Sequence, residues 1–345
     1  MEKIVDNICP GCGQEKQDQD PSLSNYVMSM DFKYCMRCFR WQHYKDLPLL
    51  LNPIINVNQH EDLPLVEHDE MMIVIDSLFL KETLLPLVPW ISKANKVNIV
   101  ATKLDLYPKQ ITPEHIYEQI HLLLKEYIQY VSMVFVTSTK IKETMDALRD
   151  YVLTKDNNYR FLFVGMINAG KSTLLNTLKE DDEITTSPYP QTTIDPIVTQ
   201  YHHVHLIDTP GLSAPSHLFY HLSPKDYEKI VPTKVVSPIT FQVFEDSSIL
   251  IGNLAIIDIE TEVTLSVSVY VSNLLSVARY KRKETLVNKL SKKEYKTTIL
   301  KPYKEGLDFI IEGVGKVHIV NQAKSVTIKH HKAITISKSK GTLLW

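Results

Sequence analysis

The segment from Gly165 to Ser172 constrains the fold of this chain more than any other. It reads Gly-Met-Ile-Asn-Ala-Gly-Lys-Ser and matches the pattern G-x-x-x-x-G-K-[ST], with an apolar run at 161–164 before it and a helical pattern at 172–178 after it. The two glycines let the backbone curl so that successive N–H groups point inward at the positive end of the following helix. The sequence therefore predicts a phosphate-binding loop between a strand and a helix. The alternative is an ordinary glycine-containing turn that matches the motif by chance.

Two side chains of this loop carry the expected chemistry. Lys171 is expected to reach the β and γ phosphates of a nucleotide, and the Ser172 hydroxyl is expected to bind Mg²⁺. The residues expected to contact the nucleotide here are Gly165, Asn168, Ala169, Gly170, Lys171, Ser172 and Thr173.

Two further segments are expected to complete the phosphate side. Asp208 opens Asp-Thr-Pro-Gly directly after the apolar run 204–207, and a carboxylate at a strand end is what a second Mg²⁺ anchor requires. Gly211 is free to donate its N–H to a γ-phosphate. Upstream, the sequence Tyr-Pro-Gln-Thr-Thr at 189–193 is similar to a switch loop in which Thr193 would complete the Mg²⁺ shell; a solvated loop threonine is the alternative.

A second pair of motifs distinguishes guanine from adenine. The sequence Thr-Lys-Leu-Asp at 102–105 follows the apolar run 97–101. The carboxylate of Asp105 can accept two hydrogen bonds, from guanine N1–H and from its exocyclic amine, which are donors that adenine does not present. The segment is similar to the N-K-x-D element of regulatory GTPases, with Thr102 in place of the Asn and so without its amide. Asp105 is therefore the predicted specificity residue, with Thr102 and Lys103 beside it.

The next expected strand, at 131–136, is followed by Thr-Ser-Thr-Lys at 137–140. This is similar to the S-A-x-K segment whose backbone N–H meets guanine O6. A Ser/Thr turn after a strand is commonplace, so the motif gains its weight from its place after that strand. We expect Thr137 and Ser138 to contact the base.

The motifs occur in a permuted order. In ordinary GTPases the phosphate motifs come first, yet here the guanine motifs at 102–105 and 137–140 precede the loop at 165–172. A circular permutation keeps such a site intact, because each motif lies at the carboxyl end of a parallel strand and the site depends on where the loops meet in space. The sequence thus predicts a circularly permuted domain that binds GTP or GDP and hydrolyses GTP.

All four cysteines fall within the first 38 residues, as Cys9-x-x-Cys12 and Cys35-x-x-Cys38. Each pair can form a tight turn that presents two thiolates to a tetrahedral ion, and four thiolates leave no open position for a catalytic water. We favour a structural zinc site, since a module of about forty residues is too small to be stable without a metal ion or a covalent cross-link. A thiol-redox pair is the alternative, although no convincing strand precedes Cys9 as it would in an oxidoreductase.

The middle of the chain alternates short apolar runs with helical patterns, which predicts a doubly wound, mostly parallel α/β sheet. The expected strands cover 71–75, 97–101, 131–136, 160–164 and 204–207, and the expected helices cover 113–127, 142–153 and 171–178. Alternating segments from about residue 213 predict a separate β-rich domain. The expected division is a zinc-binding module at 1–46, a linker at 47–70, the GTPase domain at 71–212 and the C-terminal β-rich domain at 213–345.

These features together resemble the YqeH-type circularly permuted GTPases. The resemblance rests on Cys-Pro-Gly-Cys-Gly at 9–13, Cys-Met-Arg-Cys at 35–38, the permuted motifs and Ile-Gly-Asn-Leu at 251–254. The departures are Thr102 for Asn, Ser138 for Ala, and Gln191 where Gly is common. The resemblance implies a GTPase that acts in biogenesis of the small ribosomal subunit, with the subunit or its precursor and its rRNA as partners.

Hydrolysis is expected to depend on a potassium ion. Many GTPases place a water-orienting Gln after Asp-Thr-Pro-Gly, but here Leu212 follows, which cannot hydrogen-bond. In related enzymes with an apolar residue there, an Asn at the fourth position of the phosphate loop helps hold K⁺, and Asn168 matches that position. The alternative is that Asn168 only braces the loop.

Charge is segregated along the chain. Residues 1–211 hold 19 Lys and Arg against 28 Asp and Glu, whereas residues 212–345 hold 19 against 12. The basic clusters at 279–283 and 289–296 are candidates for contact with RNA phosphates and bases. A solvated lysine-rich face is the alternative, and with it comes an alternative function, a GTP-dependent protein-interaction switch that does not bind RNA.

The remaining features bear on localisation. The first ten residues lack the positive-then-apolar layout of a secretory signal, and the apolar stretches are shorter than the ~20 residues that a membrane span requires. We therefore expect a cytoplasmic protein without a membrane span.

Overall fold

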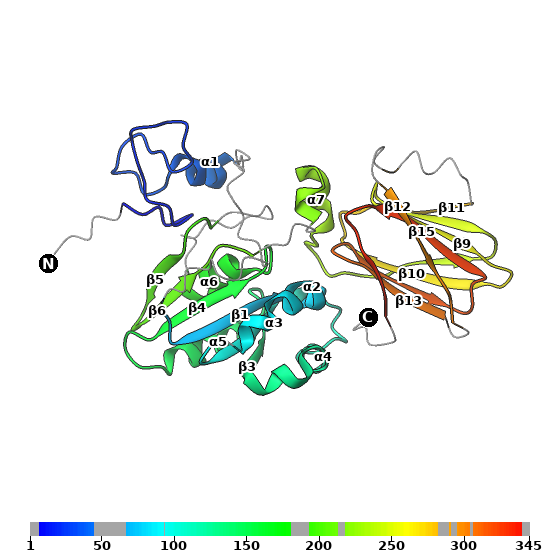
Figure 1. The fold of residues 1–345 in the computed structure, drawn as a ribbon, viewed down its shortest axis with the longest axis horizontal. Helices are drawn as coiled ribbons and strands as arrows, with labels where there is room; N and C mark the ends of the chain where they lie inside the picture. Colours follow the sequence, from blue (N-terminus) through cyan, green and yellow to red (C-terminus); the bar gives the residue numbers. More distant parts are fainter. Residues whose placement is uncertain are drawn as a thin grey trace. The chain divides into compact units, whose positions relative to one another are not determined.

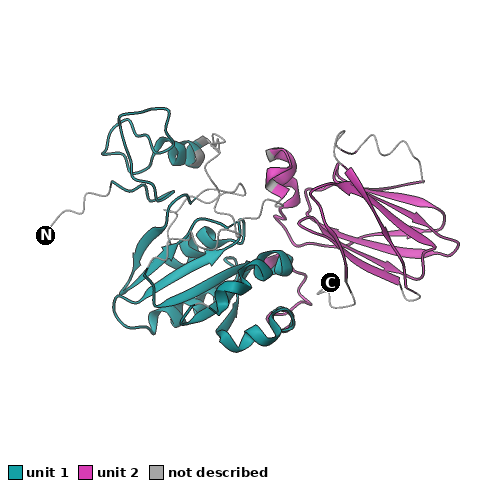
Figure 2. Cartoon of the chain, viewed as in Figure 1, with its two compact units in different colours: residues 1–104, 116–214 teal, residues 105–115, 215–345 magenta. Residues whose placement is uncertain are grey.

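The computed structural model describes residues 7–44, 67–92, 94–180, 193–212, 218–281, 290, 295–303 and 306–339. The chain divides into two compact units (Figure 2). The first contains residues 1–104 and 116–214, and the second contains residues 105–115 and 215–345. The short segment 105–115, which begins with the predicted guanine-specificity residue, therefore belongs with the C-terminal residues.

A six-stranded sheet forms the centre of the first unit, in the order β3-β2-β1-β4-β6-β5 (Figure 1). Its strands are β1 (Glu70–Asp76), β2 (Val97–Thr102), β3 (Val131–Val136), β4 (Arg160–Gly165), β5 (Ile197–Tyr201) and β6 (Val204–Asp208). All neighbours pair in parallel except β5, which runs antiparallel to β6. The strands β1 and β2 are buried along their whole length, as expected for a parallel sheet that is covered on both faces.

One α-helix of this unit precedes β1, and the others connect successive strands of the sheet. The helices are α1 (Met36–Tyr44), α2 (Leu80–Leu84), α3 (Val88–Ile91), α4 (Pro113–Leu124), α5 (Lys142–Leu153) and α6 (Lys171–Lys179), and the first three residues of α4 lie in the second unit. In α5, the buried side chains Met145, Leu148 and Val152 recur at helical spacing and pack in one core with Phe163 of β4 and Leu174 of α6. The predicted doubly wound α/β fold is confirmed.

The N-terminal residues of this unit fold around the cysteines. Two isolated β-bridges, Ile8 with Glu15 and Gln17 with Tyr26, precede helix α1. The four cysteine side chains and Val27 form a small buried cluster in place of a larger apolar core. A module this poor in buried apolar area needs a further source of stability, such as a metal.

The second unit carries two five-stranded antiparallel sheets, in the orders β16-β13-β14-β10-β7 and β11-β8-β9-β15-β12. Their bounds are β7 (Ile239–Val243), β8 (Ser247–Ile251), β9 (Ala255–Glu260), β10 (Leu265–Val271), β11 (Val277–Lys281), β12 (Tyr295–Leu300), β13 (Gly306–Ile311), β14 (Gly315–Val320), β15 (Ser325–His331) and β16 (Ile336–Ser339), and helix α7 (Pro224–Ile230) precedes them. The predicted C-terminal β-rich region is confirmed.

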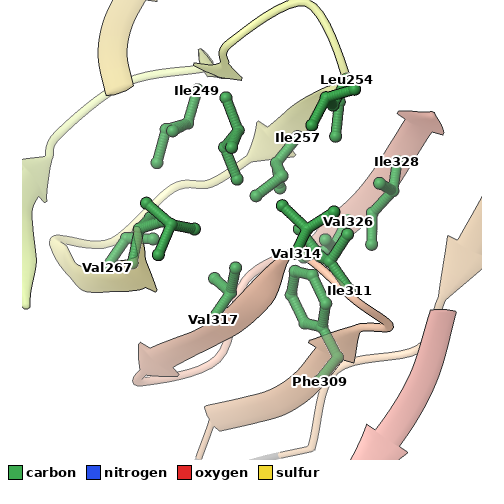
Figure 3. Close-up of a cluster of buried hydrophobic side chains, with 14 of the residues drawn as sticks. Ile249, Leu254, Ile257, Val267, Phe309, Ile311, Val314, Val317, Val326 and Ile328 are labelled. Atoms are coloured by element: carbon green, nitrogen blue, oxygen red, sulfur yellow. The ribbon is translucent and has the colours of Figure 1, made fainter. Parts of the chain in front are cut away.

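One apolar core joins the two sheets. In β10, burial alternates residue by residue, so that Leu265, Val267, Val269 and Val271 are buried. Figure 3 shows the same core with side chains from both sheets, among them Ile249, Ile257, Val267, Val317 and Phe309. This is the packing of a β-sandwich, in which the inner faces of two sheets share one core.

Candidate nucleotide and metal sites

The phosphate loop occupies the carboxyl end of β4, beside the point where the strand order reverses between β1 and β4. Gly165 lies so close to β1 that a Cβ there would be 2.4 Å from the carbonyl oxygen of Val74. Gly170 has φ of +92° and forms the N-cap of α6. Both glycines are therefore required by the backbone, and the loop leads directly into a helix N-terminus that favours an anion.

Three oxygen-bearing side chains from separate elements meet beside this loop. The Ser172 hydroxyl donates to Asp208 Oδ2 at 2.8 Å, and the Thr193 hydroxyl donates to the same oxygen at 3.1 Å. The two hydroxyl oxygens lie 3.4 Å apart. Asp208 Oδ1 is buried, and no donor among the described residues reaches it. Hydroxyl and carboxylate oxygens suit Mg²⁺, and an orphaned carboxylate oxygen fits an ion with its bound water.

Lys171 and Asp208 are both deeply buried charges. Burial lowers the pKa of the Lys171 ammonium, and the nearby Asp208 carboxylate opposes that shift. Burial likewise raises the pKa of Asp208, against the charge of Lys171 and the hydroxyl donors of Ser172 and Thr193. The Lys171 Nζ donates to the Gly165 carbonyl at 3.2 Å. Both groups are thus held in surroundings that favour an incoming phosphate and cation.

The guanine segment after β2 is anchored on the phosphate loop. The Thr102 hydroxyl donates to the Ala169 carbonyl at 2.7 Å, with the Ile75 carbonyl at 3.1 Å. Although Thr102 lacks the amide of the usual Asn, its hydroxyl ties the two loops together. Lys103 Nζ donates to the Asn168 carbonyl at 2.8 Å.

Lys103 also forms an ion pair with Asp76, whose Oδ2 lies 2.6 Å from its Nζ. Asp76 ends β1 and was not among the residues predicted from the sequence, although, like Asp208, it follows an apolar run at a strand end. Lys103 and Asn168 both adopt left-handed backbone, with φ of 67° and 61°. Such strain in non-glycine residues is concentrated at functional sites.

The loop after β3 is hydrogen-bonded to the loop after β2. Thr137 N–H donates to the Ala101 carbonyl at 2.7 Å, and Leu104 N–H donates to the Thr137 carbonyl at 3.1 Å. Ser138 N–H donates to the hydroxyl of Thr144 in the first turn of α5, so this predicted base contact is already engaged with the helix that follows its loop. Asp105 opens the segment that belongs to the second unit. Its contact with guanine, like those of Thr137 and Ser138, stays a prediction.

The Asp-Thr-Pro-Gly segment lies against the phosphate loop. Leu212 N–H donates to the Gly165 carbonyl at 3.0 Å, and its own carbonyl accepts from Ile167 N–H at 2.8 Å. A Cβ at Gly211 would lie 3.3 Å from the Ile167 Cα. The Leu212 side chain is fully buried and offers no polar group for an attacking water. The potassium role of Asn168 stays a prediction.

The four cysteines converge as predicted for a metal. Their Sγ atoms all lie within 4.8 Å of one another and all four residues are buried. The Sγ atoms of Cys12 and Cys35 are 3.8 Å apart. With Zn–S bonds of ~2.3 Å, the edge of a tetrahedron is about 3.8 Å, so the cluster fits a zinc ion.

Some predicted positions lie outside the described residues: Gln191, Arg282, Lys283, Lys289 and most of the linker. Of the basic residues that are described, Arg279 donates to the Gln242 carbonyl at 3.1 Å, and Lys281 pairs with Glu245 at 2.9 Å. Among the helices that the structure describes, none is long and apolar enough to cross a membrane.

Comparisons with known proteins agree with this geometry. The uncharacterized protein YqeH of Bacillus subtilis is 26% identical over 343 residues, which span 94% of this chain and 90% of YqeH. A family model described as a 50S ribosome-binding GTPase matches residues 160–273. The chain is a YqeH-like GTPase. The family match begins at β4 and leaves out the guanine motifs, as expected for a permuted chain whose base motifs come first.

Two further proteins are similar to part of this chain, one in sequence and one in a structural comparison. GTPase Era of Caldanaerobacter subterraneus subsp. tengcongensis is 33% identical over 144 residues, which cover 40% of this chain and 47% of Era. The crystal structure of YjeQ from Thermotoga maritima has a TM-score of 0.29 and 18% sequence identity, over 42% of this chain and 48% of YjeQ. The likeness to YqeH, in contrast, covers 94% of this chain.

Proposed function

We propose that this YqeH-like GTPase acts in assembly of the small ribosomal subunit, and that bound GTP governs its contact with the subunit precursor and its rRNA. The observation that supports ribosome contact is the extent of the likeness, since the alignment with YqeH spans 94% of the chain and the matching family model is described as ribosome-binding. That description names the 50S subunit, whereas the motif resemblance implies the small one, so the test must separate the two particles.

For hydrolysis, the chain supplies positioning and charge. Lys171 is held to neutralise the β and γ phosphates, and Ser172, Thr193 and Asp208 are the side chains that would hold Mg²⁺. The bound cation supplies further positive charge to the phosphates. Gly211 is placed against the phosphate loop, where its N–H would donate to the γ-phosphate. Because Leu212 cannot orient a water, we propose that Asn168 helps hold a potassium ion that supports the reaction.

For RNA contact, the C-terminal unit supplies the basic charge. Lys281 is largely exposed and its pairing with Glu245 is a surface ion pair, which contributes little and exchanges readily for another anion. Arg279 lies on the same strand, β11. Arg279 and Lys281 are the described basic side chains of the first cluster, at 279–283, and Lys296 of β12 is the described lysine of the second cluster, at 289–296.

The test is co-sedimentation with purified ribosomal particles. The protein is mixed with 30S, 50S or 70S particles in the presence of a non-hydrolysable GTP analogue or GDP, and the bound fraction is measured at two salt concentrations. We expect salt-sensitive binding to 30S with the analogue and weak binding with GDP. Binding only to 50S would contradict the subunit assignment. Absence of binding to every particle would overturn ribosome contact and favour a protein-interaction switch.

A further inference from the structure

We propose that the first cysteine turn of the zinc module is a positioning element of the GTPase site, which holds Thr193 where it can complete the Mg²⁺ shell of bound GTP. The inference rests on the proposed role of Thr193 and is independent of ribosome binding. It assigns Cys12 and Gly13 a function in addition to zinc binding, one exerted through their main-chain atoms.

A single carbonyl joins the cysteine turn to the segment that follows Thr193. The Cys12 carbonyl accepts the N–H of Ile194 at 2.9 Å and the N–H of Asp195 at 3.2 Å. The Ile194 side chain packs against the buried cysteine cluster. The two residues that follow Thr193 are therefore bound to the module by main-chain hydrogen bonds and by apolar contact.

Gly13 makes this contact possible. It has φ of +81°, and a Cβ at this position would lie 2.2 Å from the Asp195 carbonyl oxygen and 3.0 Å from Ile197 Cγ1. No side chain fits there without displacing the backbone at 195. A glycine after the second cysteine is therefore required both by the turn and by the close approach of the switch segment.

The same segment also contacts the proposed magnesium ligands Ser172 and Asp208. The Thr193 hydroxyl donates to Asp208, and Ile197 begins β5 opposite Asp208 in the β5–β6 pairing. The stretch 193–197 is thus held at one end by the oxygen cluster, in the middle by Cys12 and at the other end by the sheet. A displacement at Ile194 would move Thr193 directly.

The position of the Cys12 carbonyl depends on the cysteine turn. Within the turn, Gly13 N–H donates to the Cys9 carbonyl at 2.9 Å, while the two side chains of Cys9 and Cys12 point into the four-sulfur cluster. A zinc ion bound by those sulfurs would fix the turn, since metal binding and local folding are coupled in such modules. Zinc occupancy and the position of Thr193 should therefore be linked.

Linkage has a defined sign and is reciprocal. In GTPases the switch segment is ordered by contacts to Mg²⁺ and the γ-phosphate and is released in the GDP state. A turn that holds Thr193 in place should therefore favour GTP over GDP. By the same coupling, bound GTP should slow the loss of zinc, because each ligand stabilises the state that the other prefers.

The primary experiment compares Gly13→Ala with the wild-type chain. Zinc content, the affinity for fluorescent GTP-analogue and GDP in the presence of Mg²⁺, and amide exchange of the peptide that contains 193–197 are measured. We expect one zinc per chain to be retained, faster exchange, and affinity for the analogue lowered about 5- to 30-fold, with affinity for GDP changed about twofold or less. Unchanged analogue affinity together with faster exchange would overturn the proposal.

Two further variants and one control keep the outcomes separable. Ile194→Ala leaves the cysteine module intact and should shift selectivity in the same direction, which covers the case in which Gly13→Ala loses zinc. Gly313→Ala is the control, because Gly313 also has positive φ, at +73°, but lies in the second unit, where a Cβ would meet the flexible side chain of Leu218. It should leave both nucleotide affinities unchanged.

Thr193→Ala separates failure of the inference from failure of the magnesium assignment. If Thr193→Ala lowers affinity for the analogue while Gly13→Ala and Ile194→Ala do not, the coupling to the zinc module is wrong and the Mg²⁺ role stands. If Thr193→Ala has no effect, both are wrong. In the wild type, the GTP analogue should also slow transfer of zinc to a chelator, and Ile194→Ala should abolish that protection.

Discussion

The phosphate half of the candidate nucleotide site is held together by hydrogen bonds between side chains. Asp208 binds both Ser172 and Thr193 there. The guanine half is held together by main-chain hydrogen bonds. The loops after β2 and β3 are joined by the hydrogen bond from Leu104 N–H to the Thr137 carbonyl. The first half is built from buried ionisable and hydroxyl groups, and the second is built from backbone amides with an acidic residue beside them.

The difference in construction suits the part of the nucleotide that each half is proposed to bind. Phosphates and Mg²⁺ carry charge, and buried charges such as Lys171 and Asp208 act strongly only where water is excluded. A guanine base is neutral, so its recognition requires shape and a few directed hydrogen bonds. Changes in the phosphate half should therefore lower the hydrolysis rate, whereas changes in the guanine half should alter which nucleotide binds.

The largest effect is expected at Lys171. Lys171→Ala removes the cation that is proposed to face the β and γ phosphates, and the hydrolysis rate at saturating GTP should fall on the order of 100- to 1,000-fold. Phosphate release under single-turnover conditions measures it. Lys179→Ala, at the other end of α6, is the matched control and should stay near the wild-type rate. A loss of less than tenfold in Lys171→Ala would contradict the role given to this lysine.

A smaller effect, of a different kind, is expected at Asp105. Asp105→Asn replaces a charged acceptor of two hydrogen bonds with an amide, so affinity for GTP should fall about 10- to 100-fold. Affinity for xanthosine triphosphate should rise, since the amide can donate to the 2-oxo group of xanthine. Competition titrations with the two nucleotides measure this exchange. Equal loss of affinity for both would mean that Asp105 stabilises the loop and does not read the base.

Sequence patterns located most of the first sheet, because buried parallel strands are continuous apolar runs. The strands β1, β2, β3, β4 and β6 lie within one residue of their predicted bounds. Strand β5 was missed, since Ile-Val-Thr-Gln-Tyr at 197–201 is a half-exposed edge strand with no such run. The short helices α2 and α3 were also missed, because Pro86 and Pro89 interrupt any helical pattern there.

The contacts of the candidate site also divide into those that the sequence could predict and those that it could not. The clustering of Ser172 and Asp208 could be anticipated, because each belongs to a motif that directly follows a predicted strand, and Thr193 was assigned by the similarity of 189–193 to a switch loop. The contacts of Lys103 with Asp76 and of Cys12 with Ile194 could not. They join segments that are far apart in the chain through a side chain or a single carbonyl, and no local periodicity records such a contact.

A third prediction concerns the potassium dependence of the phosphate half. Hydrolysis should be faster in KCl than in NaCl by on the order of tenfold, which corresponds to about 1.4 kcal/mol of transition-state stabilisation. Asn168→Ala should remove most of this difference while leaving nucleotide affinity nearly unchanged. The measurement is the turnover rate at constant ionic strength. Equal rates in both salts, or full potassium stimulation in Asn168→Ala, would show that Asn168 only braces the loop.

The smallest effect is expected where the two halves join, at Thr102. Thr102→Val keeps the side-chain shape and removes the hydroxyl that donates to Ala169, leaving a buried carbonyl without its donor. The free energy of unfolding should fall by about 1–2 kcal/mol. Affinities for GTP and GDP should fall together, about two- to fivefold, because the hydroxyl is engaged with the carbonyls of Ile75 and Ala169 and so supports the loop. Thr102→Ser retains the donor and should resemble the wild type in thermal unfolding and in both titrations. If Thr102→Val lowered the affinity for GTP and not that for GDP, the hydroxyl would act on the γ-phosphate. Thr102 would then belong with the phosphate half and not with the residues that select the base.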